Sequence, residues 1–241
     1  MTAVLMVELL KLRRSLALLL AVVAPGLIAV FLTLSALRAD DARPWEMWMM
    51  QGAGIWAFFM LPMSVTALTA LMAHMEHGPQ SWSHLRALPV PRWRLYAAKA
   101  VATLGLIALM SAAALILPWA GLELAARLKP AIVPTGALDV GAMALMMAKV
   151  FAAGVLLVAV QLWAALRFQS FVPGLTLGIG GTFFAVVATS AKEGVFLPWQ
   201  MPVNVFASDP ARAQLALTLG GVGGLVALAL AIAHLARRDP A

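Results

Sequence analysis

The chain contains no cysteine, and its charged residues are scarce. Without a thiol the protein can form no disulfide, no thiolate nucleophile and no cysteine-ligated metal site. Charged residues make up 11% of the sequence, less than half of the roughly 25% found in an average soluble domain. Apolar residues, in contrast, make up 63%. Because so little polar surface cannot enclose so much apolar material in water, the composition predicts an integral membrane protein.

Common catalytic patterns are also absent from the sequence. The glycine-rich stretch at 174–182 has no lysine, so it cannot be a phosphate-binding loop of the Gly-x4-Gly-Lys-Ser/Thr type. Neither HExxH nor GxSxG occurs. His74, His77 and His84 stand near a single carboxylate, Glu76, and are better explained as interfacial polar residues. We therefore expect no catalytic residue, no bound metal and no hydrolysis of ATP by this chain.

Several apolar stretches are long enough to cross about 30 Å of hydrocarbon as helices. We expect an all-α membrane domain over residues 1–241 with six spans: Ser15–Leu37, Gly52–Ala73, Ala100–Ala120, Val140–Leu166, Phe171–Ala191 and Ala213–Leu235. The fifth is the least regular, because Pro173 and several glycines lower its helix propensity. Gly174/Gly178 and Gly220/Gly224 allow close helix packing, either within the chain or across a dimer interface.

The loop cations indicate how the spans are oriented. The formal net charge is +7, and the cations lie between the apolar stretches. If the N-terminus is cytoplasmic, the inner loops hold the larger share of Lys and Arg, as the positive-inside rule requires. We therefore expect both termini in the cytoplasm, and the positive charge needs no nucleic-acid partner to explain it.

Charged residues also precede the first span. The stretch VELLKLRR (7–14) places Glu8 and Lys11 one helical turn apart among apolar residues. This pattern is typical of an amphipathic helix on the inner face of the membrane. The alternative is that the first span begins early and carries a charged flank.

Two polar residues fall inside the fourth expected span. Lys149 is a candidate for the translocation path, because an intramembrane ionisable residue usually has a partner or a water-lined route. The alternative is that its long side chain reaches the membrane surface. Gln161 is a second candidate for the path, although a contact between helices explains it more simply.

A charged and aromatic segment joins the second and third spans. Gly78-Pro79 ends the preceding helix, QSWSHLRAL (80–88) predicts a short helix, and Pro89 and Pro91 end that helix in turn. The basic stretch RWRLYAAK (92–99) then enters the third span. On the expected topology this loop, 74–99, lies at the cytoplasmic face, where a short helix could dock a partner.

The segments ELLKLRRS (8–15) and WSHLRALPVPRWRLYAAK (82–99), the latter preceded by Glu76, resemble ABC transporter permeases of the type-2 export class. The closest subgroup is the permeases that give immunity to lantibiotics and related peptide antibiotics. The resemblance implies that the loop carries a coupling helix, which an ATPase subunit would bind. It implies coupling roles for Glu76, Trp82, His84, Leu85, Arg86, Leu88, Pro89, Pro91, Arg92 and Lys99.

By this resemblance the chain is the transmembrane subunit of an ATP-driven exporter in a bacterial-type inner membrane. The exporter would move a hydrophobic or amphipathic substrate, such as an antimicrobial peptide, by alternating access. Two copies of a separate ATPase would bind ATP and Mg, and a second permease chain, alike or different, would complete the pathway. The alternative from the residues alone is an ion-coupled secondary transporter that uses Lys149.

Overall fold

The computed structural model describes residues 2–13, 15–77, 89–188 and 191–237. Within these ranges the protein is all-helical, with 85% of the residues in helices and no strand. The expectation of an all-α protein is therefore confirmed for this part of the chain. An isolated bridge between Pro44 and Thr135 joins two loops at one end of the molecule.

Five helical segments are long and apolar enough to cross a membrane. Two of them are single helices, Leu16–Arg38 (α2) and Arg92–Leu128 (α6). Two others are Trp45–His77, made of α3 (Trp45–Ile55), η1 (Trp56–Met60) and α4 (Leu61–His77), and Val140–Arg167, made of α7 (Val140–Ala153) and α8 (Val155–Arg167). The last is Pro210–Arg237, made of α11 (Pro210–Leu217), η5 (Thr218–Gly223) and α12 (Gly224–Arg237). The remaining apolar helix, α9 (Val172–Val187), has 16 residues and is about 24 Å long, shorter than the hydrocarbon layer.

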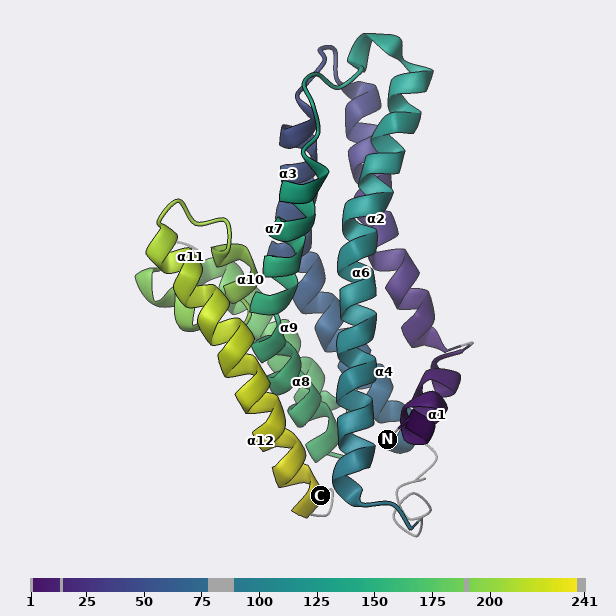
Figure 1. Ribbon diagram of the computed structural model, residues 1–241, viewed down its shortest axis with the longest axis vertical. Helices are drawn as coiled ribbons and strands as arrows, with labels where there is room; N and C mark the ends of the chain where they lie inside the picture. The colour runs from purple at the N-terminus through teal and green to yellow at the C-terminus, as the bar shows by residue number, and fades with distance from the viewer. Residues whose placement is uncertain (1, 14, 78–88, 189–190, 238–241) are drawn as a thin grey trace.

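The helices run up and down in turn, and both termini lie at the same end of the molecule (Figure 1). Helix α2 packs along α6, and α12 packs along α8. Helix α4 lies between these two pairs and contacts α2, α6, α8 and α9. Its buried side chains Leu61, Val65, Leu68 and Met72 recur at the spacing of a helix face, so this face holds the two halves of the bundle together.

Several helices are longer than the sequence predicts. The second spanning segment begins at Trp45 instead of Gly52, and α6 runs from Arg92 to Leu128. With 37 residues α6 is about 55 Å long, so its charged ends extend beyond the roughly 30 Å of hydrocarbon while remaining helical. Hydropathy predicts only the part inside the lipid. The third span, expected to end at Ala120, instead continues as α6 as far as Leu128.

Close helix packing at the glycines takes place within this chain. A Cβ added at Gly178 would overlap the side chain of Thr66 on α4. At Gly220 and Gly224 it would overlap the backbone of Ala153 and Leu156, where η5 and α12 cross the α7–α8 junction. Of the two uses that the spacing allows, contact inside the chain is therefore the one observed at these positions.

The segment between α9 and α11 folds back against the bundle. It contains η4 (Lys192–Phe196) and α10 (Met201–Asn204), and α10 packs on α7 and η1. Gln200 Nε2 donates a hydrogen bond to the carbonyl oxygen of Ala185, and Arg212 Nε donates to Asn204 Oδ1. Arg212 Nη2 also donates to the Ala191 carbonyl oxygen at 3.2 Å, so α11 holds this segment at both ends.

Candidate functional site

The N-terminal residues form a helix of their own, α1 (Thr2–Leu12), which packs against α6. The chain then breaks before α2, where Ser15 caps the new helix. Its hydroxyl oxygen accepts a hydrogen bond from Leu18 N at 3.4 Å and donates one to the Leu12 carbonyl oxygen at 2.7 Å. The first span therefore does not simply begin early. Because α1 is a separate helix, it can pack on α6 and place Glu8 and Lys11 against the other helices.

Four charged side chains meet where α1, the end of α4 and the beginning of α6 come together. Lys99 Nζ donates to Glu8 Oε2 at 2.7 Å and to Glu76 Oε1 at 2.9 Å. Lys11 Nζ donates to Glu76 Oε1 at 2.6 Å and to Glu8 Oε1 at 3.0 Å. Each ammonium thus bridges both carboxylates. We call Glu8, Lys11, Glu76 and Lys99 the ion cluster.

The ion cluster is buried and formally neutral. The side chains of Lys99 and Glu76 are 1% and 2% exposed, while that of Lys11 is 29% exposed. Isolated charges at such depth would be costly, but two cations and two anions hydrogen-bonded to each other offset much of that cost. Removing one member of such a group typically destabilises a protein by about 3–5 kcal/mol, because it leaves a buried charge unpaired.

The ionisation of Lys11 fits this arrangement. Burial alone would lower the pKa of its ammonium group, but the hydrogen bonds to Glu76 and Glu8 and their negative charges outweigh burial and raise the pKa above its ordinary value. Lys11 therefore carries its positive charge throughout the neutral pH range.

The cluster closes the base of the loop that joins α4 to α6. Glu76 lies in the last turn of α4, which ends at His77, and Lys99 lies in the second turn of α6. The two helices that the loop 78–91 connects are therefore joined by one shared set of ion pairs. His77 Nε2 also lies 3.3 Å from the carbonyl oxygen of Ala165, which links the end of α4 to α8.

The other residues expected in this loop are only partly described. Pro89 and Pro91 are exposed, and Pro91 caps α6, where its carbonyl oxygen accepts a hydrogen bond from Arg94 N at 2.9 Å. Arg92 is exposed in the first turn of that helix. The remaining expected contacts fall outside the described residues: Trp82, His84, Leu85, Arg86 and Leu88.

The two candidates for a translocation path lie in different environments. Lys149 is exposed on α7, about 27 Å along the helix from Arg167 at the end of α8. Gln161 is fully buried between α8 and α9. In the amide orientation that satisfies both of its polar atoms, it donates to the Gly174 carbonyl oxygen at 3.1 Å and accepts from Gly178 N at 3.0 Å. Gln161 thus joins two helices, and the structure does not bring Lys149 to the ion cluster.

The resemblance singled out Glu76 and Lys99, but the sequence did not indicate that Glu8 and Lys11 join them. The pattern around Glu8 and Lys11 left two alternatives open, a helix on the membrane surface or a charged flank of the first span. Neither predicts that Glu8 is only 4% exposed. One signal was available: two acids and two bases stand in otherwise apolar stretches near the expected inner boundary. Among the described residues, no group of three or more His, Asp or Glu side chains is placed to hold a metal ion.

The long apolar helices and the charged cluster beside an inter-helix loop define a multi-pass helical membrane protein. The sequence profile described as ABC-2 family transporter protein matches residues 4–188, which is most of the chain. The chain therefore belongs to this family and is the transmembrane subunit of an ABC transporter, which implies an ABC ATPase as its partner. None of the curated proteins and none of the solved structures matches it.

Proposed function

We propose that this chain is the permease of an ATP-driven exporter in a bacterial-type inner membrane. Its substrate would be hydrophobic or amphipathic, with antimicrobial peptides as the first class to test. Two copies of the ATPase would bind ATP and Mg and perform the hydrolysis, while this chain binds no cofactor. A second permease chain would complete the pathway. The observation that carries the proposal is the ion cluster at the base of the loop 78–91.

The cluster suggests how movement of the ATPase reaches the spans. On this proposal the ATPase docks on the loop through Trp82, His84, Leu85, Arg86 and Leu88. Glu76 on α4 and Lys99 on α6, the helices at its two ends, share a hydrogen bond, so a displaced loop would move α4 and α6 together. Helix α4 contacts four other helices, so its displacement changes their packing. ATP binding would thereby favour one access state of the pathway over the other.

The proposed topology has six crossings and cytoplasmic termini. Helix α9 returns from the end of α8 toward α10, and this return is what places the C-terminus at the same end as the N-terminus (Figure 1). Four arginines lie at helix ends on that side of the molecule: Arg13, Arg92, Arg167 and Arg237. Their positive charge supports a cytoplasmic location under the positive-inside rule.

The experiment is to measure coupling after breaking the cluster. In Lys99→Met, Glu8 and Glu76 lose the hydrogen bonds that Lys99 donates to them. We expect association with the ATPase to weaken at least tenfold, which corresponds to about 1.4 kcal/mol. Co-purification with the ATPase and its stimulated hydrolysis in proteoliposomes would be measured. The matched control is Lys129→Gln, which removes a lysine at the far end of α6 that donates to the Ala39 carbonyl oxygen at 2.7 Å.

A second variant separates lost coupling from lost folding. Leu85→Asp with Arg86→Glu changes the loop and leaves the four residues of the ion cluster unsubstituted. The variant should elute from a sizing column as the wild type does and still fail to stimulate the ATPase. If this variant and Lys99→Met both retain stimulated hydrolysis, the coupling proposal is wrong. The ion-coupled alternative is tested separately: transport that survives Lys149→Ala but stops when ATP is depleted at a constant ion gradient excludes it.

A further inference from the structure

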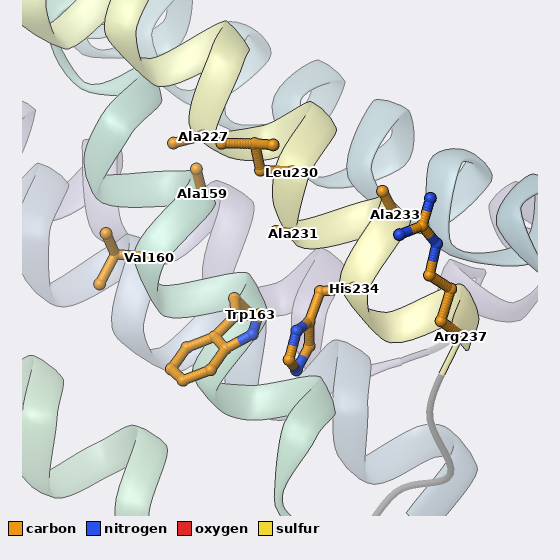
Figure 2. Close-up of a pocket in the computed structure, with 9 residues that line it drawn as sticks. All are labelled: Ala159, Val160, Trp163, Ala227, Leu230, Ala231, Ala233, His234 and Arg237. Atoms are coloured by element: carbon orange, nitrogen blue, oxygen red, sulfur yellow. The ribbon is translucent and has the colours of Figure 1, made fainter.

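A groove of about 770 Å³ lies between α8 and α12, near the C-terminal end of both helices (Figure 2). Helix α8 contributes Val160 and Trp163, and α12 contributes Leu230, His234 and Arg237. The aliphatic side chains line the upper part of the groove, and the aromatic and basic side chains line its lower part (Figure 2). It is therefore apolar at one end and cationic at the other.

The packing of α12 explains why the groove is open. Near Gly224 its backbone touches the backbone of α8, so the two helices cross without side chains between them. Farther along, Leu228 and Leu235 are buried against α8. The adjacent face carries Ala227 and Ala231, whose side chains are too short to fill the space beside α8. The groove is thus part of the helix packing and needs no movement to form.

The groove runs from the hydrocarbon to the membrane surface. No ionisable residue occurs at 213–233 of α11–α12 or at 150–166 of α7–α8. Ionisable side chains begin at His234 and Arg237 on one wall and at Arg167 on the other. The rings of Trp163 and His234 meet edge to face at this level, with centroids 6.2 Å apart. Tryptophan is typical of the membrane–water interface, so the polar end lies at headgroup depth.

We propose that this groove binds an anionic glycerophospholipid from the leaflet on the side of the termini. One acyl chain lies along Val160 and Leu230, where the wall is apolar. The phosphate lies at the polar end, where Arg237 supplies a cation and His234 a ring N–H donor. No carboxylate lines the described groove, so the site favours net negative headgroups over zwitterionic ones.

A second copy of this chain suits the groove less well. A two-fold symmetric interface places the same patch on both sides, so each Arg237 would face the other copy's Arg237. Such an arrangement places like charges in an apolar interface with no carboxylate from this patch to neutralise them. A lipid phosphate provides the missing negative charge without that cost.

The test measures lipid binding to the full permease–ATPase complex in detergent by native mass spectrometry. Phosphatidylglycerol and phosphatidylethanolamine with identical acyl chains are titrated in parallel. We expect the wild type to prefer phosphatidylglycerol, and Arg237→Gln to reduce that preference about fivefold, as expected for one cation at a lipid surface. The matched control is Arg127→Gln, which removes an exposed arginine at the opposite end of the bundle and should leave the preference unchanged.

A second variant tests the apolar half of the site. Ala231→Leu fills the groove, so it should weaken the binding of both lipids while the complex stays intact. Equal binding of the two lipids by the wild type, or an unchanged preference in Arg237→Gln, would overturn the proposal. So would an Ala231→Leu variant that dissociates the permease dimer and leaves lipid binding unaltered, because the groove would then hold a second chain. None of these readouts depends on coupling or on transport.

Discussion

Lys99 enters the bundle from the second turn of α6, and its ammonium group meets two carboxylates from different helices. The geometry makes each member of the ion cluster depend on the others, since each ammonium bonds to both carboxylates. A buried group of this kind adds little net stability compared with apolar residues of the same size. Its effect is on specificity, because only one placement of α1, α4 and α6 satisfies all four charges.

The raised pKa of Lys11 predicts a pH dependence at the alkaline end. A lysine whose pKa is raised by folding contributes stability that is fully present below its unfolded pKa of 10.5 and is lost as the pH rises through the higher folded value. We expect Lys11→Arg to remove this loss, because a guanidinium group does not titrate in that range. The difference in melting temperature between the wild type and Lys11→Arg should be constant from about pH 8 to 10 and should change above 10.5.

The measurement uses thermal unfolding of both proteins in the same detergent. The two proteins differ only at position 11, so the difference in melting temperature reports Lys11. If the two melting temperatures differ by the same amount at every pH, above 10.5 as well as below, the ion cluster does not stabilise the charged form of Lys11.

At the residue scale, the sequence could suggest only half of the cluster. The resemblance gave roles to Glu76 and Lys99, which flank one loop, but did not predict that they pair, and Glu8 is 91 residues from Lys99. Nothing in the local pattern around Glu8 shows that α1 folds onto α6 instead of lying on the membrane. The coupling roles assigned by resemblance to Glu76 and Lys99 stay predictions.

At the scale of the elements, apolar runs located the spanning segments, and five of the six are long enough in the structure. The predicted bounds are wrong at helix ends, because capping and tertiary contacts determine where a helix begins and ends. For example, α11 begins at Pro210 because the Asp209 side chain accepts a hydrogen bond from Ala211 N at 2.9 Å. Helix α9 stops at Val187, four residues earlier than expected, and the chain then folds back toward α10.

The contact between α12 and α8 predicts different effects for two neighbouring glycines. A Cβ at Gly224 would lie 2.8 Å from the carbonyl carbon of Val155, so Gly224→Ala must push two backbones apart. We expect a loss of about 1–3 kcal/mol in stability, as for other overpacked interiors. A Cβ at Gly221 would lie 3.7 Å from the Ala152 carbonyl oxygen, an ordinary contact, so Gly221→Ala should be neutral or stabilising.

Thermal unfolding and limited proteolysis of the two variants in detergent would check this prediction. The two substitutions have the same chemistry and lie one turn apart, so any difference between them reports the helix contact. Equal melting temperatures would mean that α12 can move away from α8 without cost.

At the scale of the whole molecule, the number of crossings depends on α9. It is too short to span about 30 Å as a straight helix. However, it lies between two segments that are long and apolar enough to span, α7–α8 and α11–α12. An even number of crossings places both termini on one side of the membrane, and the shared end in Figure 1 agrees with that arrangement.

The absence of cysteine makes this topology directly testable, because any introduced thiol is the only one. Asp41, Gln169 and Glu193 are exposed in three different connections. We expect Asp41→Cys and Glu193→Cys to react with a membrane-impermeant maleimide in intact cells. Gln169→Cys should react only in inverted vesicles. If Gln169→Cys and Glu193→Cys react from the same side, α9 does not cross the membrane and the six-span topology is wrong.

The wide sequence separations within the ion cluster also set an order for biosynthesis. Lys11 precedes Glu76 by 65 residues, and Glu8 precedes Lys99 by 91. Because the ribosome makes the N-terminal part first, α1 and the first span leave it before Lys99 exists. During that interval Lys11, three residues away, is the cluster lysine already available to Glu8. Glu8 therefore gains its bond to Lys99 only when the third span has been made, and arrival of that span completes the ion cluster at this end of the bundle.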